Sequence, residues 1–262
     1  MSLSIGIDSG STATKGILLN GANGGQILRR FLVPTSFRPQ EAIEQAWSQL
    51  CEGLTERPHL TLTGYGRGLI DFADKQVTEI TCHGVGARFL CSEARTIIDI
   101  GGQDSKVIHL DEEGKLTDFL MNDKCAAGTG RFLEVISHTL GAQINQLDEL
   151  VTGVAPHAIS SMCTVFAESE VISLRSAGVA PESILSGIVY SMARRSANFI
   201  GRLGVHPQVL FTGGVSRCNA FRQHLSDALN TPVETHSDAQ FAGAIGAALM
   251  GCRQKKRKNH AG

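Results

Sequence analysis

The segment Leu3–Asn20, LSIGIDSGSTATKGILLN, contains two apolar runs around a polar turn with a glycine. Runs of this kind predict a β-hairpin, because alternate side chains of a strand point to opposite faces. A second segment, Arg95–Leu110, reads RTIIDIGGQDSKVIHL and repeats the arrangement. Asp8 begins the pattern D-x-G-x-x-x-[ST]-K in the first segment, and Asp99 begins it in the second. The repeat indicates an internal duplication, with two similarly folded domains that each present a hairpin turn.

Both turns are rich in residues that handle phosphate. Glycines allow close backbone approach, turn N–H groups and hydroxyls can bind phosphate oxygens, and Lys15 can supply positive charge. Asp8 and Asp99 can hold Mg²⁺ through water, since this ion keeps much of its hydration shell. A Walker A loop is absent, so the pattern is not that of a P-loop enzyme. The candidate nucleotide-binding residues are Asp8, Gly10, Ser11, Thr12 and Lys15 in the first turn and Asp99, Gly101, Gly102 and Gln103 in the second.

A third segment, VLFTGGVSRCNAF, begins at Val209 with a predicted strand. Gly213 and Gly214 follow the strand and precede a predicted helix, where they would let a flat ring lie against the backbone. A single strand-to-helix glycine turn is weak evidence. Together with the two hairpin turns, it indicates an adenosine site.

The remaining segments predict a mixed α/β chain of two domains, 1–95 and 96–262. Alternating or one-sided apolar patterns favour three more strands and three helices. The final predicted helix is rich in alanine, which suits a contact at the hinge between the domains. The loop Gly64–Gly68 has the pattern G-x-G-x-G but lacks the dinucleotide fingerprint, so a flexible turn is the better interpretation. The predicted strands are Ile27–Val33, Leu60–Thr63 and Pro232–Thr235, and the predicted helices are Pro39–Leu54, Glu79–Ser92 and Ala239–Met250.

Two cysteines precede predicted helices. Cys125 lies in Met121–Glu134, MNDKCAAGTGRFLE, and Cys163 lies in SSMCTVFAESEVISL, which begins at Ser160. The positive end of a helix dipole and its unpaired N–H groups stabilise a thiolate, so each cysteine is a candidate nucleophile or metal ligand. The other five are interpreted as small buried hydrophobic residues: Cys51, Cys82, Cys91, Cys218 and Cys252.

Composition excludes several classes of protein. With 262 residues, 42% apolar residues and a formal net charge of −1, the chain is neither disordered nor a general nucleic-acid binder. No signal peptide is present, and Phe241–Cys252 is too short to span a bilayer, so we expect a cytoplasmic protein with no membrane contact. Seven scattered cysteines then indicate reduced thiols, and the basic run Arg253–Lys258 a solvated end.

The segments IGIDSGSTATKG, IIDIGGQDSK and VLFTGGVSRCNAF resemble the two phosphate motifs and the adenosine motif of the actin, Hsp70 and sugar-kinase superfamily. The two cysteine segments resemble more narrowly the ATP-dependent activators of 2-hydroxyacyl-CoA dehydratases and the ATPase subunits of benzoyl-CoA reductase. The resemblance covers nearly the whole chain except the basic tail. It implies a duplicated actin-like ATPase fold with the ribonuclease H-like motif, whose two domains surround a nucleotide cleft.

The resemblance also implies a homodimer with one [4Fe-4S] cluster on its two-fold axis, bound by Cys125 and Cys163 of each subunit. The number of these cysteines agrees with this expectation, because such a cluster takes four thiolates and a two-fold axis doubles the two cysteines of one subunit. ATP hydrolysis would drive single electrons from ferredoxin or flavodoxin into a partner dehydratase or reductase. Gln103 and Asp104 are candidates for positioning the attacking water near Asp8 and its Mg²⁺, and Gln240 matches a position near the nucleotide.

Two alternatives remain open at this stage. A small-molecule kinase of the same superfamily, acting on a sugar or a pantothenate-like alcohol, would use Asp99 or Asp104 as the base that activates a hydroxyl. A nucleotide-sensing module without catalysis would bind a partner protein in an ATP-dependent way. Both alternatives leave Cys125 and Cys163 without a role, and both predict a colourless protein where a cluster predicts a brown one.

Overall fold

The computed structural model describes residues 3–161 and 163–258. These residues form two compact units. The first contains residues 3–94, 110–117 and 237–258, and the second contains residues 95–109 and 118–236. No helix in the described part of the chain is long and apolar enough to cross a membrane.

The first unit is built on a mixed sheet in the order β3-β2-β1-β4-β5. β1 pairs antiparallel with β2 and parallel with β4, so the predicted hairpin is confirmed. The predicted strands near residues 27 and 60 are also present, whereas β5 was not predicted from the sequence. The strands are β1 (Leu3–Ser9), β2 (Ala13–Asn20), β3 (Gln26–Pro34), β4 (His59–Gly64) and β5 (Lys75–Gln76).

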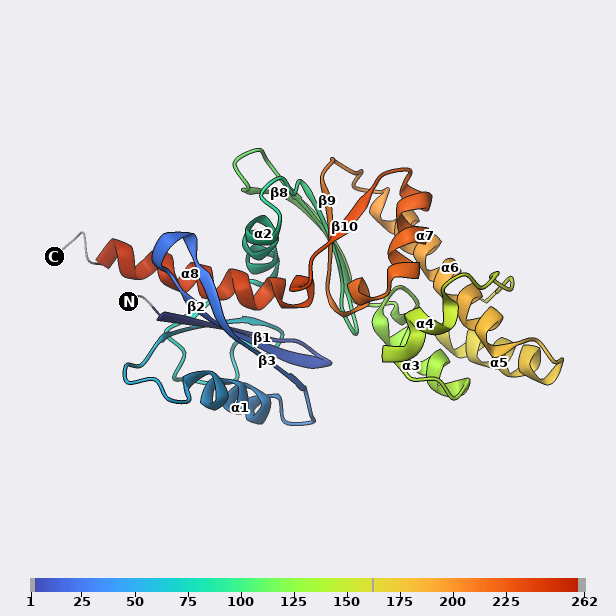
Figure 1. The fold of residues 1–262 in the computed structure, drawn as a ribbon, viewed down its shortest axis with the longest axis horizontal. Coiled ribbons are helices and arrows are strands. Elements are labelled where there is room, and N and C mark those ends of the chain that lie inside the picture. Colours follow the sequence, from blue (N-terminus) through green and yellow to red (C-terminus); the bar gives the residue numbers. More distant parts are fainter. Residues whose placement is uncertain (1–2, 162, 259–262) are drawn as a thin grey trace. The chain divides into compact units, whose positions relative to one another are not determined.

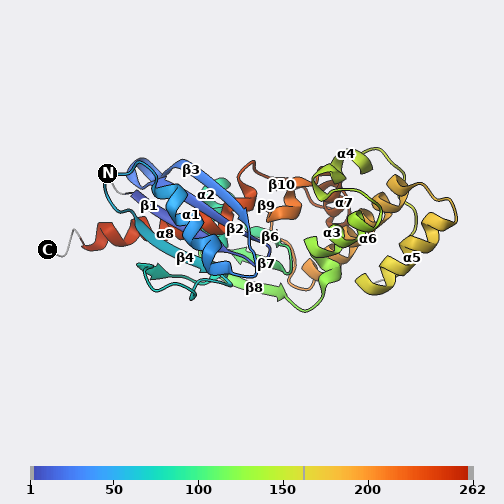
Figure 2. The same ribbon diagram turned by 90° about the horizontal axis from the view of Figure 1, so that it is seen from below.

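Helices cover both faces of this sheet. α1 (Pro39–Cys51) lies along one face and α8 (Ala242–Lys258) along the other, as Figures 1 and 2 show. α8 also packs closely against α2 (Glu79–Leu90), where a Cβ on Gly86 would collide with the carbonyl of Ala242. The three predicted helices of this unit are therefore confirmed. The prediction for the basic run after residue 252 concerns side chains outside the described part of the structure.

The second unit repeats the sheet in the order β8-β7-β6-β9-β10. β6 pairs antiparallel with β7 and parallel with β9, as β1 does with β2 and β4. The equivalent strand order confirms the duplication predicted from the repeated turns. The strands are β6 (Thr96–Ile100), β7 (Ser105–Leu110), β8 (Leu116–Asn122), β9 (Val209–Thr212) and β10 (Val233–Thr235).

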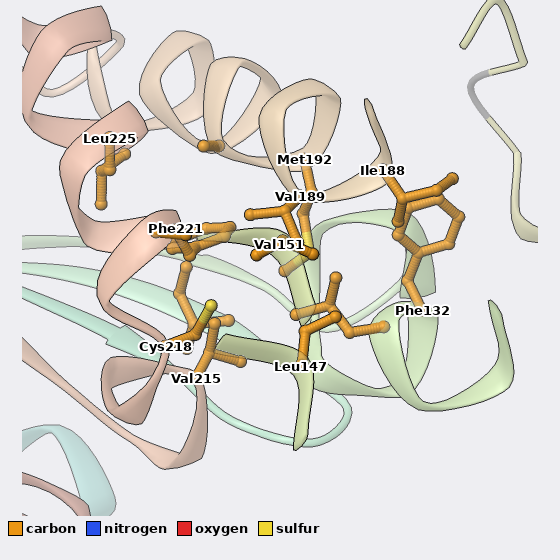
Figure 3. Packing of buried hydrophobic residues seen from close by; sticks show 14 of the residues in the cluster. Phe132, Leu147, Val151, Ile188, Val189, Met192, Val215, Cys218, Phe221 and Leu225 are labelled. Atoms are coloured by element: carbon orange, nitrogen blue, oxygen red, sulfur yellow. The ribbon is translucent and has the colours of Figure 1, made fainter. Parts of the chain in front are cut away.

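The core of the second unit lies between its sheet and a group of helices. Phe132 from α3 packs near Ile188 from α6, while Phe221 from α7 stacks on Phe211 of β9 with ring centroids 5.6 Å apart (Figure 3). This core holds the helices that carry the two cysteine segments against the strands that carry the second turn. The helices are α3 (Gly130–Thr139), α4 (Leu147–Val151), α5 (Thr164–Ser176), α6 (Pro181–Ile200) and α7 (Asn219–Leu229).

Candidate functional site

The first turn brings a buried carboxylate and two basic side chains together. Asp8 ends β1 opposite Lys15 of β2, and Asp8 is only 3% exposed. Lys15 Nζ and His83 Nε2 each lie 4.0 Å from Asp8 Oδ2. The exposed Ser11 and Thr12 form the tip of the turn, next to the half-buried Gly10. The turn thus has a buried carboxylate at its base, and the residues that carry hydroxyl groups at its tip are exposed to solvent.

Three buried polar atoms beside this turn have no hydrogen-bond partner. They are Asp8 Oδ1, Ser9 Oγ and Thr63 Oγ1. Buried side-chain polar atoms in proteins are nearly always satisfied by protein groups, ordered water or a bound ion. Asp8 and Thr63 are paired across β1 and β4, so their side chains lie on one face of the sheet and suit a hydrated cation, whereas the side chain of Ser9 points to the other face. Gly243 lies beside this carboxylate, and a Cβ on this residue would come within 2.8 Å of Asp8 Oδ2.

The second turn has the same register but a different set of contacts. Asp99 of β6 pairs with Lys106 of β7, as Asp8 pairs with Lys15. Here Thr212 Oγ1 donates a hydrogen bond of 2.7 Å to Asp99 Oδ1. Lys106 Nζ lies 3.5 Å from Asp99 Oδ2 and 2.8 Å from Asp104 Oδ2, and its side chain is 1% exposed. Asp99 is thus held by protein groups, and Asp104 forms a close ion pair.

A glycine with positive φ follows the parallel strand beside each turn. Gly213 has φ 85° after β9, and Gly64 has φ 83° at the end of β4. A Cβ on Gly213 would collide with the backbone of Ile100, whereas Gly214 has open space where its Cβ would be. Gly64 therefore occupies the position equivalent to Gly213, which the flexible-turn interpretation of its loop missed. The shared signal in the sequence is Thr-Gly directly after an apolar strand.

Short 3₁₀ turns correct two of the predicted helix starts. The 3₁₀ turn η4 (Gly214–Arg217) separates Gly213 from α7, so the glycines do not run directly into the helix. Similarly, Cys125 caps the 3₁₀ turn η2 (Ala126–Gly128), and α3 begins only at Gly130. The small residues that were predicted to open one helix instead span the break between this 3₁₀ turn and α3.

Backbone hydrogen bonds join the second turn to the start of α3. The amide of Gly130 donates to the carbonyl of Gly101, and the amide of Arg131 donates to the carbonyl of Gly102, both at 2.8 Å. First-turn amides of a helix have no partner within the helix, so this turn supplies their acceptors. The second turn is therefore linked directly to the first residues of α3.

Cys125 and Cys163 are both exposed and line one cavity of about 550 Å³ in the second unit. Cys163 caps α5, whose amide at Ala167 donates to the Cys163 carbonyl. None of the described residues that line the cavity is acidic. Its other chemically distinctive lining residues are Lys106, Lys124, Arg195 and Ser196.

Side chains hold both cysteine segments in place. The Asn122 amide group donates to the Cys125 carbonyl and accepts from the Cys125 amide. Glu170 accepts hydrogen bonds from the backbone amides of Ser160 and Ser161 at 2.8 and 2.7 Å, just before Cys163. Partial burial raises the pKa of Glu170, but hydrogen bonds from Ser161 and Ser160 outweigh burial and lower this pKa to about 2.

Arg195 brings positive charge to the cavity. Its guanidinium carbon lies 4.9 Å from the centre of the Phe132 ring, a cation–π contact. Burial lowers the pKa of Arg195, and interaction with Cys125 opposes this effect. Lys106 and Arg195 were missed as cavity residues, because their position depends on segments far apart in the chain, and Lys124 was given no role although it directly precedes Cys125.

A third cysteine also precedes a helix, so the count of two predicted from the sequence is wrong. Cys218 caps α7, but it is 8% exposed and its sulfur lies near Val215 and Phe221 in Figure 3. Burial raises the pKa of Cys218 to about 11. Cys218 is therefore a core residue. Cys82 and Cys252 are also buried as predicted, while Cys51 and Cys91 are only partly buried.

Two further predicted site residues lie in different units, Gln103 in the second and Gln240 in the first. Gln103 is exposed at the tip of the second turn, close in sequence to the ion-paired Asp104. Gln240 is half-buried in the 3₁₀ turn η5 (Ala239–Phe241) that precedes α8. Within the described residues, no group of three or more histidine, cysteine, aspartate or glutamate side chains is arranged to hold a metal ion.

Comparison with known proteins identifies the family. Residues 5–251 match the BadF/BadG/BcrA/BcrD ATPase family. The chain belongs to this family. It is 68% identical to the uncharacterized protein YjiL of Escherichia coli K12, over 98% of this chain and 100% of YjiL.

Other relatives of this ATPase-family chain have described activities. The chain is 43% identical to the (R)-2-hydroxyglutaryl-CoA dehydratase activating ATPase of Acidaminococcus fermentans, over 94% of this chain and 95% of that protein. It is 39% identical to the activator of 2-hydroxyisocaproyl-CoA dehydratase from Clostridium difficile, solved with bound ADPNP. That structure has a TM-score of 0.92 and covers 99% of this chain and 98% of its own. The actin-like ATPase fold and the resemblance to dehydratase activators are thus confirmed.

Proposed function

We propose that this member of the activator ATPase family hydrolyses ATP and uses an iron–sulfur cluster to pass single low-potential electrons to a partner enzyme. The partner is a 2-hydroxyacyl-CoA dehydratase or a benzoyl-CoA reductase-like enzyme. The observation that carries the proposal is that Cys125 and Cys163, both exposed, line one cavity in the unit that also carries the second phosphate-type turn. Relatives that activate dehydratases support it.

Residues of both turns would serve Mg-ATP. The partnerless oxygen of Asp8 and the hydroxyl of Thr63 suit a hydrated Mg²⁺, and Lys15 would neutralise phosphate charge. The ADPNP-bound relative supports nucleotide binding by the fold. The residues assigned to the nucleotide are Asp8, Gly10, Ser11, Thr12, Lys15, Asp99, Gly101, Gly102, Gln103, Gly213, Gly214 and Gln240.

Hydrolysis needs a water molecule in line with the γ-phosphate. Gln103 is exposed at the tip of the second turn and would orient that water through its amide. Asp104 is ion-paired with Lys106, so it would act by shaping the turn and by attracting the metal. As the bond from the water oxygen to the γ-phosphorus forms, the bond from that phosphorus to the oxygen bridging to the β-phosphate breaks, and ADP and inorganic phosphate are released.

The cavity fits a [4Fe-4S] cluster shared by two copies of the chain. Cluster binding takes four thiolates, and each copy offers two exposed cysteines, so a two-fold axis completes the set. Lys124 and Arg195 line the same cavity and would provide positive charge near the thiolates. The cluster would supply one-electron reduction, with ferredoxin or flavodoxin as the electron donor.

Coupling between nucleotide and cysteines would pass through α3. Its first two amides are bonded to Gly101 and Gly102, and Cys125 lies a few residues before it. Nucleotide hydrolysis can shift a conformational equilibrium only if the nucleotide states interact differently with the two conformations. A turn that moves with the γ-phosphate meets this requirement.

Iron content after anaerobic purification tests the proposal. The wild-type chain should be a brown dimer with about two iron atoms per chain. Cys125→Ser and Cys163→Ser should each lose the iron while still binding Mg-ATP. Cys218→Ser is the matched control, because this cysteine also caps a helix but is buried, and it should keep the iron.

Full iron content in either of the first two variants would overturn the cluster assignment. A colourless wild-type protein with ATP turnover would favour the kinase or the nucleotide-sensing alternative. Phosphorylation of an added sugar or pantothenate-like alcohol would then identify the kinase.

A further inference from the structure

Glycines let the backbones of α2 and α8 come into contact beside the first turn. A Cβ on Gly246 would collide with the carbonyl of Cys82, as a Cβ on Gly86 would with the carbonyl of Ala242. The next residue on α2 after Cys82 is His83, whose side chain is therefore held deep in the first unit. His83 is 5% exposed.

The imidazole of His83 lies between two carboxylates. Its Nε2 is 4.0 Å from Asp8 Oδ2 and 3.8 Å from Oε1 of Glu79, one helical turn earlier on α2. Gly243 of α8 makes room for this arrangement, because a Cβ there would come within 2.8 Å of Asp8 Oδ2 and 2.9 Å of His83 Nε2. The close approach of the two helices thus places the ring against the carboxylate of the first turn.

The two oxygens of Asp8 have different surroundings. Lys15 Nζ and His83 Nε2 each lie 4.0 Å from Oδ2. Oδ1 is buried without a hydrogen-bond partner, and it lies close to Gly64, where a Cβ would come within 2.5 Å of it. Nitrogen groups of the protein therefore face Oδ2, and Oδ1 is the oxygen that a hydrated metal ion can use.

We propose that His83 is a positioning residue for the Mg-nucleotide: its ring fixes Oδ2 of Asp8 and so presents Oδ1 to the water shell of the metal. Glu79 holds the ring in this place. The inference rests on the ATPase function proposed above and adds to its metal site. Groups that orient a metal-binding side chain without touching the metal typically change metal affinity or activity by about 10- to 100-fold when they are removed.

Calorimetry of ADP binding to the full chain, with and without Mg²⁺, tests this role. His83→Leu keeps a similar volume but removes both ring nitrogens. It should lower the affinity for Mg-ADP by roughly three- to tenfold, near the lower end of that range because the metal meets Asp8 through water. Affinity for metal-free ADP should stay within a factor of about two. His83→Gln retains an N–H donor and should recover most of the Mg-ADP affinity.

His59 provides a matched control in the same unit. It also lies beside a glycine of α8, since a Cβ on Gly251 would come within 2.9 Å of His59 Nδ1. However, His59 begins β4, whereas Thr63 and the first turn lie at the other end of that strand. His59→Leu should therefore bind Mg-ADP and metal-free ADP as the wild type does.

A double substitution shows whether His83 acts through Asp8. Asp8→Asn alone should lower the affinity for Mg-ADP, and adding His83→Leu should cause no further loss, because coupled residues are not additive. Gly243→Ala covers the case in which His83→Leu does not fold. Alanine favours the helix, and its methyl group would press on both side chains, so this variant should also lose Mg-ADP affinity.

Equal affinity for Mg-ADP in the wild type, His83→Leu and Gly243→Ala would overturn the proposal. So would a full additional loss from His83→Leu in the Asp8→Asn background, or an equal loss of metal-free and Mg-bound ADP. Neither iron nor a partner enzyme enters these measurements. A wild-type chain that binds Mg-ADP but holds no iron would therefore overturn the electron-transfer function and leave this inference standing.

Discussion

Thr212 donates a 2.7 Å hydrogen bond to Asp99 across two parallel strands. The equivalent pair in the other repeat, Thr63 and Asp8, occupies the same register without such a bond, and both groups have an atom that is buried and has no hydrogen-bond partner. Each repeat therefore has a threonine paired with an aspartate, but the two aspartates make different contacts. Asp99 is held by protein groups, and Asp8 retains an oxygen for a ligand.

Replacement of the two threonines should separate these roles. Thr212→Val removes a buried hydrogen bond to a carboxylate and should lower the free energy of unfolding by about 1–3 kcal/mol. Thr63→Val removes a hydroxyl that makes no hydrogen bond to Asp8 and only a weak interaction with the Cys82 thiol, and it should change this free energy by less than about 1 kcal/mol. Urea unfolding without nucleotide measures both values, and equal losses would contradict the difference between the repeats.

Asp8→Asn should abolish Mg-dependent ATP turnover while leaving the iron content unchanged. The amide cannot attract a hydrated cation as a carboxylate does, and a loss of at least about 100-fold in kcat is expected for a group that holds the metal. Phosphate release and iron analysis on the same sample measure both properties. Turnover within a factor of about two of wild type would place the metal elsewhere.

Alanine at the two glycines of VLFTGG should have unequal effects. Gly213→Ala must adopt φ 85° and place its Cβ against the backbone of Ile100, so a loss of about 2–4 kcal/mol in unfolding free energy is expected. Gly214→Ala points into open space and should leave stability within about 0.5 kcal/mol. Weaker nucleotide binding by the stable Gly214→Ala, measured by calorimetry, would support the adenosine assignment.

The carboxyl of Glu170 should make stability depend on acid. Its pKa in the folded protein is about 2, below the ordinary value of 4.5, so its ionised form favours folding. This contribution is complete above about pH 4.5 and is lost as the pH falls toward 2. Glu170→Gln should melt about 2–4 °C lower than wild type at neutral pH, a value discounted for solvent screening.

The melting difference between Glu170→Gln and wild type should shrink as the pH falls through this window. The exposed Glu234 offers a matched control, and Glu234→Gln should melt with the wild type at every pH. A difference that persists unchanged at pH 2 would show that Glu170 acts through packing and not through its charge.

Local patterns predicted much of the fold. The hairpin Leu3–Asn20 and its repeat Arg95–Leu110 were recognisable because strand alternation and turn glycines act within a few residues. The one-sided apolar spacing of α1 was visible for the same reason. β5 and β8 were missed, since β5 is two residues long and β8 is largely exposed, with no buried face to create a pattern.

The cavity could not be predicted in the same way. Arg195 reaches it from the middle of α6, and Lys106 from β7, and nothing near either residue in the sequence indicates the cysteines. The equivalence of Gly64 and Gly213 likewise depends on strand order. Such relationships come from tertiary packing, which local spacing does not encode.

The equivalent strand orders also show where the two repeats differ most. The connection from β3 to β4, residues 35–58, contains α1, whereas the equivalent connection from β8 to β9, residues 123–208, contains α3 to α6 and both exposed cysteines. Both exposed cysteines, and the cluster proposed for them, thus belong to one crossover. The two sheets keep the same strand order, although the described part of one crossover contains one α-helix and that of the other contains four.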